Sequence, residues 1–406
     1  MFSQERYSRL SVGAIKALYF LLYVGMAAWS TQFYAFLERE RALTGLQIGT
    51  IAAVQQINNM LILPFWGMIS DRYGKRKIFL ILLLCAAICI EGFLVHGNFL
   101  FYFLFIIFFT AINNPLASLA DSFALEKANQ SVIHAGYGSM RMWASFGWAI
   151  SSFGTGFLIK NTELSFGIIF PITSVSFVAT WIIAFTSLNK KHEQKTKKSP
   201  SFKTLVELLS QNKKLVFFFF FCLMYYICNA PLLNMISLYY TEVCGMYYND
   251  LPIDELNSKI GLIVGIACGV QSLCELPFMS YADKFLTRFG VKNVIFFTMI
   301  VAVIRMVLYG ISPNPWLSIG IGCLHGITLG LFWVAAVGYV HSLVPKEQNS
   351  TGQMLFNSFL AIGTCLGNLW TGFMKDYISL QMGMLVNASC IVLLLIVAIV
   401  VKRKRY

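Results

Sequence analysis

The chain contains about twelve long runs of predominantly apolar residues, separated by short polar segments. Each run has about 20 residues or more, the length of α-helix that crosses a hydrocarbon core of about 30 Å. Inside a bilayer the backbone must satisfy its own hydrogen bonds, and a helix of this length does so. With 57% hydrophobic and only 12% charged residues, the composition is also typical of a membrane protein. We therefore predict an all-α membrane protein with twelve transmembrane helices.

The basic residues indicate how these helices are oriented. The net charge is +13, which in a soluble protein would raise the question of a nucleic-acid partner. With the N-terminus inside, however, 24 of the 31 Lys and Arg residues fall on one side, five fall on the other, and Arg141 and Arg305 lie within spans. The positive-inside rule then places both termini in the cytoplasm. We expect no nucleic-acid partner and a multi-pass protein of the plasma membrane, of the bacterial inner-membrane type.

A Lys-rich segment with Pro200 interrupts the apolar pattern near the middle of the chain. We predict a cytoplasmic linker at 189–214 that joins an N-terminal six-helix bundle, 1–188, to a C-terminal six-helix bundle, 215–406. Nine of the ten cysteines lie in apolar spans, so we interpret them as small apolar residues rather than disulfide partners or metal ligands. We expect neither a metal nor a cofactor.

The two predicted bundles carry similar loops at similar places. Asp71-Arg72-Tyr73-Gly74-Lys75 follows the second span, and Asp283-Lys284 with Arg288-Phe289-Gly290-Val291-Lys292 follows the eighth. Parallel repeats of this kind are typical of transporters whose binding site lies at the repeat interface. The sequence contains no Gly-x4-Gly-Lys-Ser/Thr phosphate loop, so we expect transport to be driven by a gradient.

Three ionisable residues lie inside apolar runs of the second half: Glu275, Arg305 and His325. Counting about 1.5 Å per residue places Glu275 about 12 Å and Arg305 about 20 Å from one membrane face, and His325 about 14 Å from the other. All three therefore fall in or near the middle third of the core. Ionisable side chains at that depth are costly and normally face a protein interior or a cavity. The pattern indicates a proton or substrate site; a structural ion pair beside a buried histidine is the alternative.

Four further residues complete the predicted site. Asp121 and Arg141 fall in the inner third of neighbouring spans, where they can pair, and Trp143 offers an aromatic face, although helix packing is its ordinary role. Asn229 lies beside Pro231, and a proline at mid-membrane frees backbone groups near transporter cavities. The predicted substrate-binding and proton-coupling residues are thus Asp121, Arg141, Trp143, Asn229, Glu275, Arg305 and His325.

The segment from Gly67 to Lys77 resembles the Gly-x-x-x-Asp-Arg-x-Gly-Arg-Lys signature of the major facilitator superfamily. The resemblance implies the fold of that superfamily, two six-helix bundles, over the whole chain. It also implies that the loop aspartate helps to hold the inward gate shut. By position, the implied gate residues are Gly67, Asp71, Arg72, Gly74 and Lys75, with Asp283 and Arg288 in the second repeat.

Within the superfamily, the chain resembles the branch of lactose permease, nucleoside–proton symporters and phenylpropionate permease-like proteins. Met140 to Ala149 is similar to a fifth-helix motif of lactose permease, whose arginine lies in the sugar site. Glu275 to Arg305 is similar to the eighth and ninth helices of nucleoside–proton symporters, and Leu324 to Trp333 to the phenylpropionate group. The match to lactose permease is incomplete at Thr328, three residues after His325, where that protein has a glutamate.

These features favour a proton-coupled symporter that takes up a small polar organic solute, such as a nucleoside or an oligosaccharide, by alternating access. A proton antiporter that exports a drug or metabolite is the alternative with the same fold, and a membrane receptor or scaffold without transport is a third hypothesis. We expect no enzymatic activity, because no nucleophile and base are paired in the sequence. The expected partners are a small-molecule substrate, protons and the lipid bilayer, and we expect a monomer.

Overall fold

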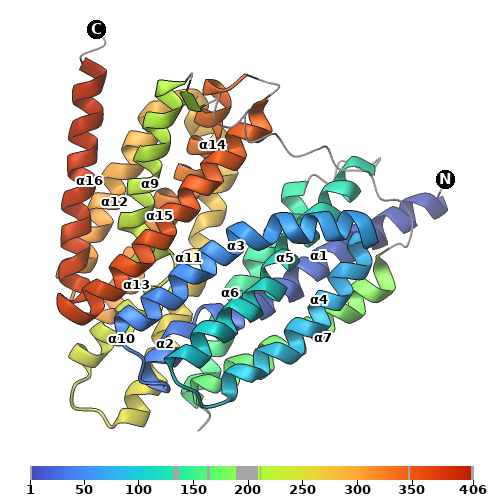
Figure 1. Ribbon diagram of the computed structural model, residues 1–406, viewed down its shortest axis with the longest axis horizontal. Coiled ribbons are helices and arrows are strands. Elements are labelled where there is room, and N and C mark those ends of the chain that lie inside the picture. Colours follow the sequence, from blue (N-terminus) through green and yellow to red (C-terminus); the bar gives the residue numbers. More distant parts are fainter. Residues whose placement is uncertain are drawn as a thin grey trace. The chain divides into compact units, whose positions relative to one another are not determined.

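The computed structural model describes residues 2–130, 137–161, 165–188, 209–210, 212–345 and 348–403. Within these ranges every regular element is helical, and no strand occurs (Figure 1). The all-α prediction is therefore confirmed. The predicted linker at 189–214 lies largely outside the described residues.

The helices follow one another along the chain with short connections. In order they are α1 (Phe2–Ser30), α2 (Phe33–Arg39), α3 (Gly45–Tyr73), α4 (Lys75–Cys89), η1 (Ile90–Leu94), α5 (Phe99–Gln130), α6 (Tyr137–Asn161), η2 (Phe166–Ile168), α7 (Ile169–Ser187), α9 (Lys213–Leu233), α10 (Ile236–Tyr247), α11 (Ile253–Phe289), α12 (Val291–Ile311), α13 (Pro315–Gly322), η3 (Gly326–Leu331), α14 (Phe332–Leu343), α15 (Asn349–Tyr377) and α16 (Leu380–Arg403).

Nine helical segments of the described chain are long and apolar enough to cross a membrane. The long helices α3, α6 and α15 fall outside this set, with 29, 25 and 29 residues respectively. In α3 the amides Gln55, Gln56, Asn58 and Asn59 interrupt the apolar sequence. Length still suits these three helices to a bilayer, and their assignment as spans stays a prediction.

The chain forms two compact units whose boundaries cut through helices. Unit 1 comprises Met1–Leu43, Asn58–Thr196 and Pro252–Leu273, and unit 2 comprises Thr44–Ile57, Lys197–Leu251 and Cys274–Tyr406. Both α3 and α11 therefore contribute to both units. The bundle boundaries expected from the sequence, 1–188 and 215–406, describe the order of the spans along the chain and remain a prediction.

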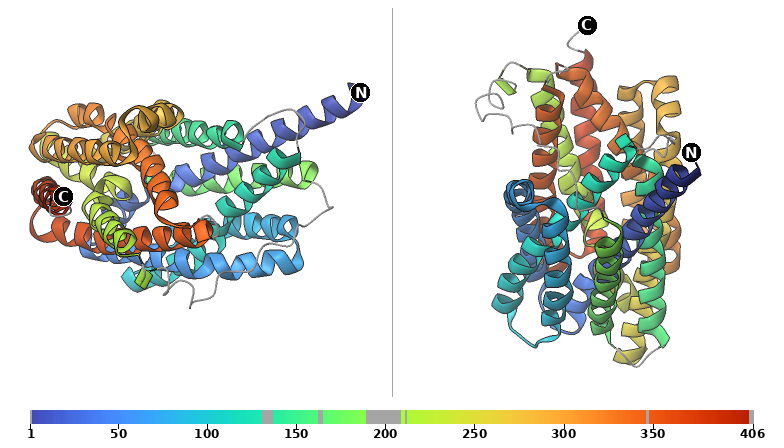
Figure 2. Two further views of the ribbon diagram at one scale, coloured as in Figure 1. Left: turned by 90° about the horizontal axis from the view of Figure 1, so that it is seen from above. Right: turned by 90° about the vertical axis from the view of Figure 1, so that its right-hand side faces the viewer.

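In unit 1, α1 packs along α6 and α7, as the ribbons show (Figures 1 and 2). Small hydroxyl residues make this close packing possible. Ser151 Oγ donates to the backbone oxygen of Val24 at 2.7 Å, and Ser176 Oγ donates to that of Leu21 at 2.6 Å. Such hydroxyl bonds between helices are a usual contact where the surroundings are apolar.

In unit 2, α9 packs along α15, and α12 packs along α16 (Figure 1). One buried amide connects three of these helices. Asn387 Nδ2 on α16 donates to the backbone oxygen of Cys228 on α9, and Asn387 Oδ1 accepts from Trp370 Nε1 on α15, both at 2.9 Å. The side-chain oxygen and nitrogen of Asn387 are thus both satisfied, as a buried amide requires.

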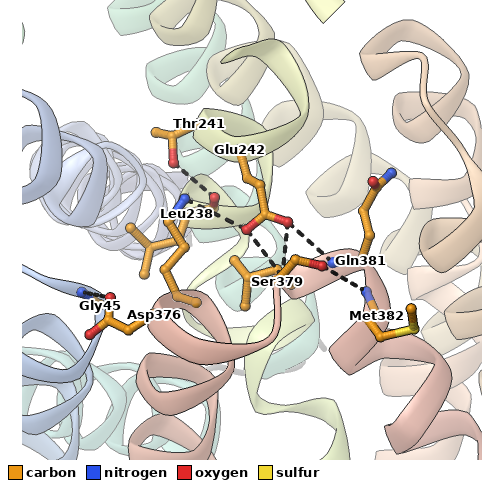
Figure 3. Close-up of polar contacts among 10 residues, drawn as sticks. Gly45, Leu238, Thr241, Glu242, Asp376, Ser379, Gln381 and Met382 are labelled. Atoms are coloured by element: carbon orange, nitrogen blue, oxygen red, sulfur yellow. Dashed lines mark hydrogen bonds and ion pairs between the residues drawn. The ribbon is translucent and has the colours of Figure 1, made fainter. Parts of the chain in front are cut away.

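Two carboxylates of unit 2 cap helix N-termini (Figure 3). Asp376, near the end of α15, accepts the backbone N–H groups of Gly45 at 2.6 Å and Leu46 at 2.7 Å, at the start of α3. Glu242 on α10 accepts the N–H of Leu380 at 2.9 Å and 3.0 Å, at the start of α16. The first N–H groups of a helix lack partners within it and carry a partial positive charge, so both carboxylates stabilise the ends they cap.

Single glycines separate two pairs of long helices. Gly74 lies between α3 and α4 with φ +99°, and Gly290 lies between α11 and α12 with φ +79°. A residue with a Cβ rarely adopts these angles, so glycine permits each sharp one-residue turn. The two loops that look alike in sequence thus also share a backbone conformation, as an internal repeat should.

Candidate functional site

Three predicted residues of unit 2 form a hydrogen-bonded row. Glu275 comes from α11, Arg305 from α12, and His325 from the short segment between α13 and η3. His325 Nε2 lies 2.8 Å from Glu275 Oε1, and His325 Nδ1 lies 3.1 Å from Arg305 Nη1. The structure therefore brings together the three side chains that were placed at similar depth by counting residues.

The arginine determines which nitrogen of His325 carries the proton. A guanidinium has donors only, so the bond from Arg305 Nη1 requires a lone pair on His325 Nδ1. The imidazole proton then lies on Nε2, from which it is donated to the Glu275 carboxylate. A second proton on Nδ1 would face the N–H of Arg305 and break that bond. In this geometry the imidazole donates through Nε2 and accepts through Nδ1.

Exposure changes along the row. The Glu275 side chain is 23% exposed, that of His325 is 8% exposed, and Arg305 is fully buried. The carboxylate is thus the most exposed member of the row. Arg305 Nη1 also donates to Thr328 Oγ1 at 3.0 Å, and the guanidinium carbon lies 5.6 Å from the centre of the Tyr309 ring. Its Nε and Nη2 have no partner among the described residues.

The row depends on a close approach between α11 and the tenth predicted span. A Cβ added to Gly326 would collide with the backbone oxygen of Cys274, the residue before Glu275. The absence of a side chain at Gly326 therefore lets His325 reach Glu275. The span is also irregular at this point: α13 ends at Gly322, and a π-helical turn, η3, follows from Gly326 to Leu331.

A second cluster lies in unit 1, where Asp121 on α5 meets Arg141 on α6. Asp121 Oδ1 lies 3.7 Å from Arg141 Nε and accepts a hydrogen bond from the Tyr19 hydroxyl at 2.7 Å. The guanidinium lies over the Tyr23 ring at 4.6 Å. Both charged side chains are about one-third exposed, at 36% and 35%.

Two other predicted site residues lie apart from the charged side chains. Trp143 is 39% exposed and packs edge-on against Phe20, with ring centres 6.3 Å apart. Asn229 is buried in α9, where its Nδ2 donates to the backbone oxygen of Tyr225 at 2.9 Å. The amide thus bonds its own helix, at the residue whose hydroxyl reaches Thr328 beside the unit 2 row.

The predicted gate residues lie at the ends of long helices. Asp71, Arg72 and Gly67 belong to the exposed last turns of α3, and Lys75 begins α4. In the second repeat, Asp283 and Arg288 are exposed near the end of α11. The guanidinium carbon of Arg72 lies 5.3 Å from the centre of the Tyr73 ring, and that of Arg288 lies 5.4 Å from the centre of the Phe289 ring. This stacking on the next aromatic residue is common to both repeats.

Sequence reasoning missed the polar contacts that Tyr19, Tyr23, Tyr225 and Thr328 make with the predicted residues or beside them. Their aromatic or hydroxyl character is ordinary in a membrane span, and only the fold brings them to the charged groups. Within the described residues, no group of three or more His, Cys, Asp or Glu side chains is placed to hold a metal ion.

Long apolar helices in two repeats, with charged side chains clustered inside each unit, define a multi-pass membrane transporter. The chain matches the MFS_1 like family over residues 13–386, and it belongs to that family. It is therefore a transporter rather than an enzyme, and its substrate is a small molecule. The expected superfamily is confirmed.

Individual relatives cover nearly the whole chain. The uncharacterized transporter YwbF of Bacillus subtilis (strain 168) is 28% identical over 379 residues, which is 92% of this chain and 88% of that protein. The maltose permease of Geobacillus stearothermophilus is 25% identical over 362 residues, 89% and 86% of the two chains. The crystal structure of the nucleoside transporter NupG has a TM-score of 0.79 at 18% identity and covers 95% of this chain and 98% of that one. The last match shows the shared fold.

Proposed function

We propose that the protein is a proton-coupled symporter that takes up a small polar organic solute, such as an oligosaccharide or a nucleoside, by alternating access. The observation that carries this proposal is the row of Glu275, His325 and Arg305, with its carboxylate end exposed and its guanidinium end buried. Ionisable groups in membrane spans are retained where they move protons or hold substrates. The relative named maltose permease supports a carbohydrate as the solute.

In this proposal Glu275 carries the proton. While Glu275 is ionised, it accepts the Nε2 proton of His325 in a charge-assisted bond, and through His325 it offsets the buried charge of Arg305. Protonation of Glu275 removes that negative charge and weakens the bond. The two protonation states therefore favour different arrangements of α11 and the segment around His325, which is what coupling to a conformational change requires.

The cluster of Asp121, Arg141, Tyr19 and Tyr23 is suited to a polyhydroxylated solute. A carboxylate accepts hydrogen bonds from hydroxyl groups, a guanidinium donates them, and aromatic rings pack against the apolar faces of sugars or against bases. Partial exposure leaves Asp121 and Arg141 accessible to a solute. Trp143, which follows Arg141 by two residues and is also exposed, is a further aromatic ring that could contact the solute.

Replacing Arg141 with lysine should weaken solute binding without abolishing proton coupling. Lysine keeps the positive charge but loses the planar fork that stacks over Tyr23. A lost stacking interaction of this kind, with the loss of the planar donor group, corresponds to about a tenfold rise in the apparent KM for uptake. The measurement is initial uptake rate against solute concentration at a fixed pH gradient. A KM within twofold of the wild-type value would remove Arg141 from the proposed binding site.

Export of a drug or metabolite by proton antiport is the second candidate, because the fold serves either direction. Two buried or half-buried arginines, Arg141 and Arg305, repel lipophilic cations and favour neutral or anionic solutes. That charge pattern is the reason we place uptake first.

The remaining proposals concern how the protein lies in the membrane and how it closes. We propose a bacterial inner-membrane location with both termini in the cytoplasm, from the distribution of basic residues, and a monomer as the working form. The exposed residues at the ends of α3 and α11, Asp71 and Arg72 in one repeat and Asp283 and Arg288 in the other, are proposed to close the cytoplasmic side.

Uptake into proteoliposomes with an acidic exterior tests the proposed function. Radiolabelled disaccharides, nucleosides and aromatic acids would be offered in turn, with and without a protonophore. We expect uphill accumulation of one class that collapses when the protonophore is added. Accumulation only in inverted vesicles, or only with a gradient of the opposite sign, would show export instead.

A further inference from the structure

The tenth predicted span contains a π-helical turn directly after His325. The turn, η3, runs from Gly326 to Leu331, between α13 and α14. A π turn is wider than an α turn and occurs mainly as a single turn at functional sites. Its backbone carbonyls bond to N–H groups five residues ahead instead of four. Thr328 lies in the middle of this turn.

Thr328 is bonded through both its backbone and its side chain. Its backbone oxygen accepts the Tyr225 hydroxyl of α9 at 2.7 Å. Its Oγ1 accepts from Arg305 Nη1 at 3.0 Å and lies 3.4 Å from the backbone oxygen of His325, to which it donates. Thr328 is only 2% exposed. A buried threonine normally needs one partner for its hydroxyl, whereas this one joins two members of the row.

The same nitrogen of Arg305 contacts both Thr328 and His325. Nη1 carries two hydrogens, one for Thr328 Oγ1 and one for His325 Nδ1. With the first bond in place, the guanidinium plane is held so that its second hydrogen points at the imidazole. Without the Thr328 hydroxyl, Arg305 keeps His325 Nδ1 and the Tyr309 ring as contacts, but its guanidinium plane is less firmly oriented, because its Nε and Nη2 have no partner among the described residues.

We propose that Thr328, seated on the π turn and held by Tyr225, is a positioning residue that fixes the tautomer of His325 through Arg305. This inference rests on the proposed function, since it assigns the residue that prepares Glu275 to exchange a proton. If Arg305 leaves Nδ1, the imidazole proton can move there, and the lone pair of Nε2 then faces the ionised Glu275. The carboxylate loses its donor, and proton binding at Glu275 is no longer linked to Arg305.

The Tyr225 hydroxyl also helps to hold Thr328 in position, independently of Arg305. The Tyr225 ring stacks on Phe332, the residue after η3, with ring centres 4.4 Å apart and planes 26° from parallel. Its hydroxyl satisfies the Thr328 carbonyl in the widened turn. Removing the hydroxyl takes a donor from this buried carbonyl, and we expect η3 to shift and Thr328 to rotate.

The test compares Thr328→Val with Thr328→Ser in proteoliposomes. Valine matches the shape of threonine but cannot accept from Arg305, whereas serine keeps the hydroxyl. We expect Thr328→Val to lower pH-driven accumulation about tenfold, the size of one lost hydrogen bond to a charged group. Solute counterflow, which needs no net proton movement, should stay near the wild-type rate. Thr328→Ser should restore accumulation, and only the valine variant should shift the pH profile of uptake.

Thr364→Val is the matched control. Thr364 is a buried threonine of α15 whose Oγ1 bonds its own helix, at 2.9 Å from the Leu360 oxygen, and we expect wild-type accumulation. If Thr328→Val also loses counterflow, the variant is generally defective, and Tyr225→Phe is used to test the inference instead. Tyr225→Phe keeps the stacked ring and removes one hydroxyl, so it should lower accumulation and leave counterflow intact.

The inference would be overturned if Thr328→Val accumulated solute at the wild-type level with the wild-type pH profile. The same result in Tyr225→Phe would overturn it if Thr328→Val had lost counterflow. Failure of the proposed function has a different signature: the wild-type protein itself would then show no uphill accumulation that collapses with a protonophore, whatever the Thr328 variants do.

Discussion

Glu275→Gln should abolish proton-driven accumulation while leaving solute exchange largely intact. Glutamine fills the same volume, and its side-chain oxygen can still accept the Nε2 proton of His325, which lies 2.8 Å from Glu275 Oε1. It cannot take up a proton at any physiological pH, so solute movement is no longer tied to the proton gradient. Accumulation driven by an imposed pH gradient should fall to the equilibration level, whereas counterflow continues. Both are measured with the same labelled solute in proteoliposomes.

Glu91→Gln is the control for this experiment. Glu91 is another glutamate within an apolar run, in η1 of unit 1, and it is not part of the row. Its replacement should leave accumulation near the wild-type level. Uphill accumulation by Glu275→Gln at the wild-type ratio would show that another group carries the proton, and the row would then be a structural ion pair.

Gly326→Ala should both destabilise the protein and stop transport. The new Cβ would collide with the backbone oxygen of Cys274, and a backbone atom in a packed helix has little room to move away. Overfilling a close contact of this kind costs about 1–3 kcal/mol. Moving α11 away from His325 also lengthens the hydrogen bond to Glu275, which directly follows Cys274. We expect a lower unfolding temperature in detergent and loss of accumulation.

Gly338→Ala provides a matched comparison in the same span. No atom lies within 4 Å of a Cβ built at Gly338, and alanine favours helix over glycine by about 1 kcal/mol. This variant should be as stable as the wild type or slightly more stable, and active. Equal behaviour of the Gly326 and Gly338 variants would show that the close approach at Cys274 is not needed for the row.

The all-helical fold and the family were predictable from the sequence, because both depend on local patterns. Apolar runs long enough to span a bilayer and a loop signature from Gly67 to Lys77 are each visible within a few tens of residues. The same is true of the ionisable residues within spans. Glu275, His325 and Arg305 were recognised by their cost at that depth, and the structure places them in contact. Their role in transport stays a prediction.

What the sequence could not show is how these side chains are held. Tyr225 and Thr328 meet across 103 residues of chain, and Tyr19 reaches Asp121 across 102. Such pairs follow from tertiary packing, which local hydrophobic patterns do not specify. The π turn at Gly326–Leu331 is equally hidden, because its residues are as apolar as those of a regular span. Thr328 was noticed only as a departure from a related protein.

The division of α11 between the two compact units bears on how the chain is assembled during synthesis. Unit 1 needs residues 252–273, which pack beside α6, where a Cβ added to Gly156 would lie 3.0 Å from the backbone of both Gly261 and Gly265. Domains generally fold as the chain emerges, N-terminal part first. Here the first unit cannot close until more than half of the protein has left the ribosome. Until then, the small-residue face of α6 lacks the segment that packs on it, and a truncated first half expressed alone would keep that face exposed.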